Sequence, residues 1–277
     1  MLQQTRVVAV IPYYHRFLKR FPDVRTLAAA PENDLLACWS GLGYYSRARN
    51  LQKAAKEIVA RGAFPNTFDD ILNLPGIGPY TAAAVASIAF DLAHAAVDGN
   101  VRRVFSRLTN DANINAQMVT DKLLDRKAPG EWNQAVMELG AVVCLPRNPN
   151  CDSCPLRKYC AAYKAGTMEQ LPPKKIKPET ERLNRTLLII RHSGRLLLAP
   201  AQRVNGFWEL PEKLPAAKAG ARLGEFAHSI TFRRYRFEVF EASTQAAPQD
   251  HRWVEEADLS QLPLSTVAKK ALKLLSE

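Results

Sequence analysis

Apolar residues recur at helical spacing through the first 163 residues of the chain. Between residues 51 and 59, and again between 136 and 143, they follow the i, i+3, i+4, i+7 pattern of one buried helix face. Turn-forming pairs such as Pro65-Asn66 and Pro75-Gly76 separate the helical runs. The pattern therefore predicts an all-α region over residues 1–163.

The pattern changes after that region. Residues 164–182 are rich in Pro and Lys, which predicts an extended linker. Residues 183–200 hold two apolar runs around a His-Ser-Gly-Arg turn, as in a β-hairpin, and Tyr235, Phe237 and Val239 alternate with charged residues as in a half-exposed strand. Ser265 is a suitable N-cap for a closing helix. We expect residues 183–277 to form a small α+β domain, which makes the protein multidomain.

Charge and hydropathy narrow the function classes. The 277 residues carry a formal net charge of +11, which favours a polyanionic partner such as nucleic acid over a merely solvated basic surface. No stretch is apolar for long enough to cross a bilayer, and the N-terminal sequence does not have the pattern of a signal peptide. We expect a cytoplasmic, nucleoid-associated monomer.

Four of the five cysteines lie within seventeen residues and suggest a metal site. Cys144, Cys151, Cys154 and Cys160 are separated by six, two and five residues. Four thiolates in one short loop can hold either a structural zinc ion or an iron–sulfur cluster. Zinc sites usually have two close pairs, so this uneven spacing favours iron–sulfur. Cys38 stands apart, and we expect it to be an ordinary small buried residue.

Two further motifs carry candidate chemistry. In the segment 74–80, Gly76, Ile77 and Gly78 predict a tight turn whose N–H groups, feeding a helix over 81–90, can bind a phosphate; a plain helix–turn–helix corner is the alternative. Asp98 precedes a predicted helix over 98–108, where the helix dipole and free N–H groups stabilise a carboxylate. For an isolated Asp, a simple capping role would be the better interpretation.

Together these motifs resemble those of the helix-hairpin-helix DNA glycosylases of the endonuclease III type. The resemblance implies a [4Fe–4S] cluster on the four cysteines, a DNA-phosphate contact at residues 76–78, and further phosphate contacts from Arg147, Arg157 and Lys158. Asp98, eighteen residues after Tyr80, matches the family's catalytic aspartate, which stabilises positive charge on the sugar. Asn100 matches a supporting hydrogen-bonding residue.

Tyr80 and two short segments indicate which branch of this family the chain resembles. Members that also cleave the strand carry Lys where this chain has Tyr80, so the sequence resembles monofunctional glycosylases. The segments 1–6 and 41–47 resemble those of MutY-type adenine glycosylases, which remove adenine opposite 8-oxoguanine or guanine in double-stranded DNA. A helix start with packed tyrosines is the alternative for segment 41–47. The substrate-contacting residues that this resemblance implies are Leu2, Gln3, Gln4, Thr5, Arg6, Leu42, Tyr44, Gln134 and Met137.

The C-terminal domain resembles the Nudix-like domain with which these glycosylases read 8-oxoguanine. The resemblance places Phe226, Ala227 and His228 in its recognition loop, with Ala227 where the family has Ser or Thr. The acidic box of true Nudix hydrolases is lacking, so pyrophosphatase activity is not expected. The predicted domains are residues 1–163 with the iron–sulfur loop at 144–160, the linker 164–182, and residues 183–277.

One expected catalytic group is missing from this sequence. In the family a glutamate, the general acid at the purine, lies two positions before the methionine that here is Met1. We therefore expect strongly reduced glycosylase activity with retained affinity for damaged DNA. The rival interpretations are a non-enzymatic damage-binding protein, a bifunctional endonuclease III-like enzyme, and an electron-transfer iron–sulfur protein.

Overall fold

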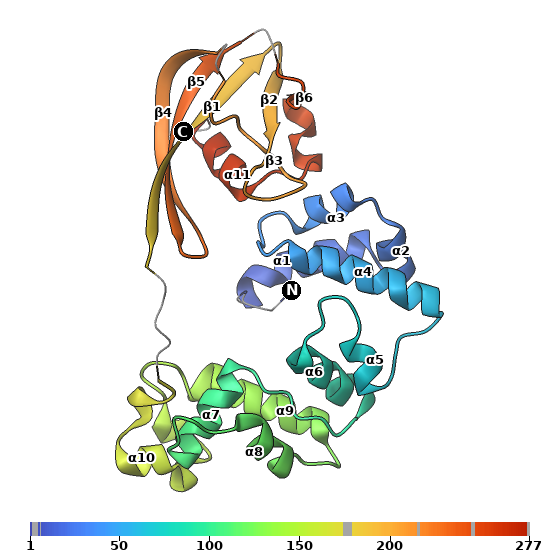
Figure 1. Cartoon of the computed structure of the whole chain (residues 1–277), viewed down its shortest axis with the longest axis vertical. Coiled ribbons are helices and arrows are strands. Elements are labelled where there is room, and N and C mark those ends of the chain that lie inside the picture. Colours follow the sequence, from blue (N-terminus) through green and yellow to red (C-terminus); the bar gives the residue numbers. More distant parts are fainter. Residues whose placement is uncertain (2–4, 6, 174–178, 215–216, 245–246, 276–277) are drawn as a thin grey trace. The chain divides into compact units, whose positions relative to one another are not determined.

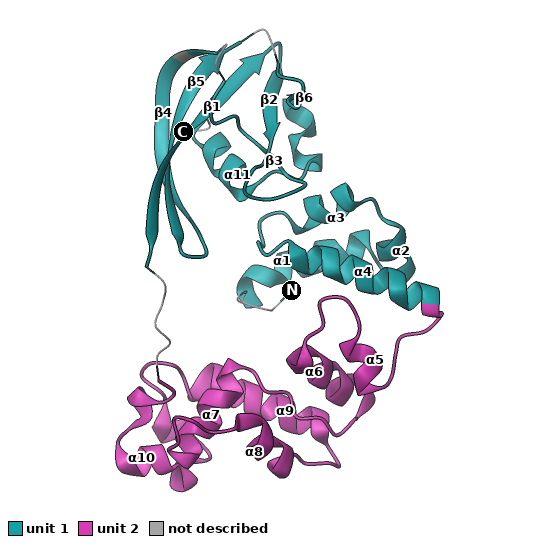
Figure 2. Cartoon of the chain, viewed as in Figure 1, with its two compact units in different colours: residues 1–60, 178–277 teal, residues 61–177 magenta. Residues whose placement is uncertain are grey.

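The computed structural model describes residues 1, 5, 7–173, 179–214, 217–244 and 247–275 (Figure 1). The chain forms two compact units, one of residues 1–60 and 178–277 and one of residues 61–177 (Figure 2). This division differs from the predicted domains, in which residues 1–163 form a single domain. Within the described residues, no helix is long and apolar enough to span a membrane.

Four helices form the N-terminal part of the first unit. They are α1 (Val7–Arg20), α2 (Val24–Ala29), α3 (Glu32–Trp39) and α4 (Ser46–Arg61). Helix α4 confirms the helix predicted around residues 51–59. Edge-to-face packing of Phe17 on Phe21 and Trp39 forms the centre of their core. Cys38 packs at the edge of this core and is only partly buried, which corrects the expectation of a buried residue.

The remainder of the first unit is a six-stranded mixed sheet with a helix on one face (Figure 1). Its elements are β1 (Glu181–His192), β2 (Arg195–Pro200), β3 (Trp208–Glu209), β4 (Lys218–Ile230), β5 (Arg233–Ser243), β6 (Arg252–Glu255), the 3₁₀ segment η5 (Glu256–Gln261) and α11 (Thr266–Lys273). The strand order is β3-β2-β1-β5-β4, with β6 beside β2 and β1 parallel to β5.

Local sequence signals account for most of this sheet domain. The predicted hairpin is confirmed, since β1 and β2 pair antiparallel across a turn in which Ser193 and Gly194 both have positive φ. Tyr235, Phe237 and Val239 are buried along β5 as the alternation predicted. The Ser265 hydroxyl accepts from the N–H of Ala268 and caps α11, also as predicted.

The loop between α3 and α4 contacts the sheet domain within the first unit. The Ser40 hydroxyl donates to the carbonyl of Leu264 at 2.6 Å, and the Tyr45 ring lies 4.0 Å from that of Phe207, centroid to centroid. Phe207 belongs to the same apolar core as Trp39. The N-terminal helices therefore share a core with a loop of the C-terminal domain.

The second unit is helical and contains both glycine-rich and cysteine-rich segments. Its elements are α5 (Phe68–Leu72), α6 (Pro79–Phe90), α7 (Gly99–Thr109), α8 (Ala116–Leu123), α9 (Pro129–Glu138), the π-helical turn η1 (Leu139–Val143), the 3₁₀ turns η2 (Cys151–Ser153) and η3 (Arg157–Tyr159), α10 (Ala161–Ala165) and the 3₁₀ turn η4 (Met168–Gln170). The Thr67 hydroxyl accepts from the N–H of Asp70 and caps α5. The helix predicted over 136–143 ends as a π turn, which brings Gly140 against Asn100.

Part of the predicted linker is folded. Helix α10 and η4 occupy residues 161–170, and the backbone carbonyl of Leu171 accepts from the buried guanidinium of Arg107 at 2.9 Å. Extended structure over 164–171 was therefore a wrong prediction, because tertiary contacts with α7 outweigh a composition typical of linkers.

Helices α6 and α9 touch at Gly130. A Cβ at Gly130 would lie 2.7 Å from the carbonyl oxygen of Ser87 and 3.0 Å from the Cα of Ile88. We expect Gly130→Ala to destabilise the second unit by about 1–3 kcal/mol, because the backbones must separate. Gly99→Ala, where a Cβ meets nothing within 4 Å, is the matched control. Equal urea midpoints for the two variants would contradict this packing.

Candidate functional site

The Asp98 carboxylate is fixed at the N-terminus of α7. Its Oδ1 accepts from the N–H groups of Asn100 at 2.8 Å and Val101 at 2.7 Å, and its Oδ2 accepts from the Asn100 side-chain amide at 3.0 Å. The predicted N-cap is confirmed. Since these bonds use both oxygens, they set the position and the rotation of the carboxylate.

Tyr80 lies in the first turn of α6, near Asp98. Its hydroxyl donates to the Met137 sulfur at 3.4 Å. Burial raises the pKa of Tyr80, and the negative charge of Asp98 raises it further. The phenol therefore stays protonated at neutral pH. The structure thus brings together four of the predicted residues: Asp98, Asn100, Tyr80 and Met137.

Arg103 connects Asn100 to the segment that leads into the cysteine loop. Its Nη2 donates to the Asn100 side-chain oxygen at 3.0 Å and to the carbonyl of Gly140 at 2.6 Å, and its Nε donates to the carbonyl of Cys144 at 2.8 Å. Arg103 is only 7% exposed. Sequence reasoning missed it, although an Arg among the apolar positions of α7 is the available signal.

All four clustered cysteines line one cavity. The other lining residues are Arg107, Val143, Pro149, Asn150, Arg157, Tyr163 and Met168. Burial raises the pKa of the Cys151 thiol, and the charges of the other three cysteines raise it further. Crowded thiolates repel each other, so a cationic centre between them is required for all four to ionise. The donor set therefore fits a metal centre.

Among the described residues, no three His, Cys, Asp or Glu side chains lie close enough to hold one metal ion, so the preference for a cluster rests on the spacing of the cysteines in the sequence. Arg107 donates to the Cys144 sulfur at 3.3 Å, as expected for a thiolate ligand beside a cluster.

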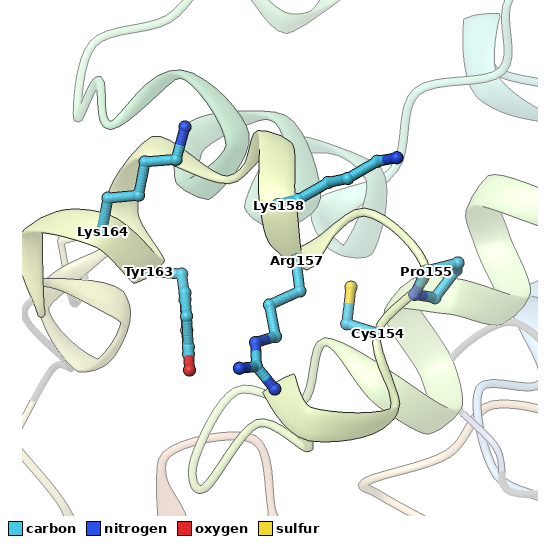
Figure 3. A pocket seen from close by; sticks show the side chains of 6 residues that line it. All are labelled: Cys154, Pro155, Arg157, Lys158, Tyr163 and Lys164. Carbon is cyan, nitrogen blue, oxygen red and sulfur yellow. The ribbon is translucent and has the colours of Figure 1, made fainter.

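Basic side chains surround a second, open hollow on the outer side of the loop. Arg157, Lys158 and Lys164 line it together with Tyr163 (Figure 3). Arg157 pairs with Asp152 at 3.0 Å, while Lys158 and Lys164 are exposed. Arg147 is also exposed. The loop therefore presents cations to solvent.

The turn before α6 has the predicted glycine geometry. Gly76 has a φ of +78°, which favours glycine, and the N–H of Ile77 bonds back to the carbonyl of Leu74 at 3.1 Å. Gly78 is the N-cap of α6 and is exposed, with Pro79 in the first helical turn. A phosphate can approach the first N–H groups of α6 without meeting a side chain at Gly78.

The other residues predicted to contact the substrate, in the second unit and in segment 41–47, differ in solvent exposure. Gln134 is exposed and donates to the carbonyl of Gly130 at 3.1 Å, so its side chain lies along its own helix. Leu42 is buried, whereas Tyr44 is 54% exposed with a φ of +49°. Only Tyr45 of the two tyrosines is packed, which leaves Tyr44 available to a partner.

Arg47 joins Thr5 to this segment. Its guanidinium donates to the Thr5 hydroxyl at 3.3 Å, to the carbonyl of Gly43 at 3.3 Å and to the carbonyl of Met1 at 3.0 Å, and it lies over the Tyr44 ring. Sequence reasoning gave Arg47 no individual role. Four other predicted contacts lie outside the described residues: Leu2, Gln3, Gln4 and Arg6.

Phe226, Ala227 and His228 lie inside strand β4, which corrects the expectation of a loop. They pair with β5, and the Phe226 ring stacks on Phe237 at 5.3 Å. Alternation leaves Ala227 exposed between two partly buried side chains. Burial lowers the pKa of His228, and the charge of Lys270 lowers it further. Neutral His228 therefore faces the sheet–helix core.

Two family models and several curated proteins match this chain. A family model of HhH-GPD superfamily base excision DNA repair proteins matches residues 1–129, and one for the iron–sulfur binding domain of endonuclease III matches residues 144–160. The adenine DNA glycosylase of Buchnera aphidicola subsp. Baizongia pistaciae is 40% identical over 222 residues, covering 76% of this chain and 62% of that protein. The adenine DNA glycosylase of Mus musculus is 31% identical over 362 residues, covering 100% of this chain and 70% of that protein.

Solved structures agree with these matches. A thermostable thymine-DNA glycosylase superposes with a TM-score of 0.55 at 28% identity, covering 59% of this chain and 80% of that one. Endonuclease III in a non-covalent DNA complex gives a TM-score of 0.53 at 26% identity, with the same coverage of 59% and 80%. The cofactor that fits the cysteine loop is accordingly a [4Fe–4S] cluster. The chain spans 62% and 70% of the length of the two curated relatives above.

Replacing a cluster ligand tests the metal site. We expect Cys154→Ser to lose most of its iron and visible absorbance, and to lower the stability of the second unit by more than about 4 kcal/mol, because metal binding contributes directly to folding. Cys38→Ser, outside the cavity, is the matched control. Unchanged iron content in Cys154→Ser would rule out this ligand set.

Proposed function

This chain belongs to the adenine DNA glycosylase family, and from that premise we propose that it hydrolyses the N-glycosidic bond of adenine in duplex DNA. The proposed substrate is adenine opposite 8-oxoguanine or guanine. The observation that carries the proposal is the Asp98 carboxylate, which three hydrogen bonds fix in place and whose charge raises the pKa of Tyr80.

Asp98 supplies the negative charge that the reaction needs. Breaking a purine–sugar bond builds positive charge on the deoxyribose, and a carboxylate held in place stabilises that charge without reorganising. The target nucleotide must first leave the stack. Tyr80 has no amine with which to form a Schiff base, which supports base removal without strand cleavage. Among the described residues its hydroxyl bonds to a weak thioether acceptor, an interaction that it can exchange for one with the DNA.

The adenine itself would contact α9. Met137 lies beside Tyr80, and the Gln134 amide can exchange its bond to the Gly130 carbonyl for the edge of the base. Outside these contacts, the exposed turn at Gly76–Gly78 and the cations at Lys158 and Arg147 would bind phosphates. The cluster held by the four cysteines supplies a structural centre that orders this basic loop.

The first unit supplies the proposed contacts to the opposite base. Thr5 and Tyr44 are joined by Arg47, and the exposed Tyr44 ring is suited to stack on a base. Leu42 supports that segment from the core. The sheet domain would contribute Phe226, Ala227 and His228 as a Nudix-like reader. We propose that a monomer binds the duplex.

The carboxylate is tested by Asp98→Asn, which keeps an acceptor for the N–H groups of α7. We expect adenine release from an 8-oxoguanine:adenine duplex to fall roughly 10²- to 10³-fold under single turnover, because the stabilising charge is lost. Asp91→Asn, at the C-cap of α6, should keep the parent rate. Affinity for the duplex should change little in both variants.

Two results would contradict the proposal. Equal adenine release by Asp98→Asn and the parent chain would remove Asp98 from the chemistry. Borohydride trapping of a covalent protein–DNA adduct would instead support the bifunctional alternative, because only a Schiff base is trapped this way.

A further inference from the structure

The segment that leads to Asp98 is buried at its centre and has no regular secondary structure. Residues 91–98 form neither helix nor strand, and Ala95 and Ala96 are 4% and 1% exposed. Buried backbone N–H and C=O groups must find other partners, and an unpaired one costs about 1–3 kcal/mol. The N–H of Leu92 bonds to the carbonyl of Ala86 in α6, and side chains supply partners for the buried centre, where Gln117 of α8 donates to the carbonyl of Ala95 at 3.2 Å.

One side chain supplies two of those partners. The Asn133 amide oxygen accepts from the N–H of Ala96 at 2.9 Å, and its amide nitrogen donates to the carbonyl of His94 at 2.9 Å. The second hydrogen of that nitrogen goes to the Ser87 hydroxyl at 2.8 Å. Asn133 is 1% exposed and Ser87 is 0% exposed. Every donor of the Asn133 side chain is used, without access to water.

Asn133 thereby joins three elements that each carry a residue of the site. Its own helix, α9, carries Met137. Ser87 belongs to α6, which carries Tyr80, and its hydroxyl passes the link on to the carbonyl of Ala84 at 3.3 Å. Residues 94–97 lead directly into Asp98. Helices α9 and α6 lie close together here, because Gly130 of α9 packs against the backbone of Ser87.

We propose that Asn133 is a positioning residue, which fixes Asp98 relative to Tyr80 and the base-contacting face of α9. This inference rests on the proposed glycosylase function. Only an Asn amide offers one acceptor and two donors at this reach; Asp would keep the acceptor and lose both donors. A misplacement of about 1 Å at a reacting group can cost about 10²-fold in rate, so the clamp matters for the chemistry beyond its effect on stability.

The test compares Asn133→Ala with Gln52→Ala. Gln52 is also a buried amide that donates to two backbone carbonyls, those of Leu27 and Ala30, but it lies in the first unit. We expect Asn133→Ala to slow single-turnover adenine release by roughly 10- to 100-fold, with iron content and duplex affinity within about twofold of the parent. Gln52→Ala should keep the parent rate.

A second readout does not depend on catalysis. The phenol of Tyr80, followed by NMR with labelled tyrosine and assigned through Tyr80→Phe, should titrate at lower pH in Asn133→Ala, as in Asp98→Asn, because the carboxylate no longer lies beside it. If the parent chain releases no adenine, the proposed function fails, yet this titration still tests the clamp. Parent-like titration and parent-like relative rate in Asn133→Ala would overturn the inference.

Ser87→Ala keeps the test decisive should Asn133→Ala not fold. It removes only the link to α6 and leaves both bonds to the 94–97 segment. We expect a loss of roughly three- to tenfold in rate with normal iron content. A parent-like rate in Ser87→Ala would show that α6 is not held through this clamp, and an equal loss in Gln52→Ala would reduce the effect to general stability.

Discussion

Arg103 joins the end of α7 that carries Asp98 to the backbone that enters the cysteine loop. One guanidinium donates to Asn100, Gly140 and Cys144, and Asn100 in turn donates to the carboxylate. Because the guanidinium is planar and always charged, its three bonds fix direction as well as distance. The geometry of the candidate site therefore depends on a buried cation that we do not predict to contact the substrate.

The chain on both sides of Asp98 is held by buried polar side chains. The segment before it is held by Asn133, and the residues after it are held by Arg103. Close contacts at Gly130 and Gly140 leave no room for a side chain at either position. Polar clamps on a tightly packed helical scaffold thus replace the sheet that positions catalytic groups in many other folds.

Local signals in the sequence were sufficient for the helix caps at Asp98 and Ser265 and for the glycine turn before α6, because caps and turns depend on neighbouring residues. The cysteine spacing likewise indicated a metal site. Arg103 and Asn133 were missed, since most of their partners lie dozens of residues away; the one local signal was an Arg among the apolar positions of α7. Strand β4 was misjudged at Phe226–His228, because its pairing with β5 is set by the sheet. The folded part of the linker depends on Arg107.

The contacts of Arg103 imply that the cysteine loop positions Asp98. Single-turnover adenine release by Arg103→Lys tests this most directly. Lysine keeps the charge but cannot donate to three separate acceptors in a fixed fork. We expect the rate to fall roughly 10- to 100-fold while iron content and duplex affinity remain those of the parent. A parent-like rate with the cluster in place would show that the carboxylate holds its position without the loop.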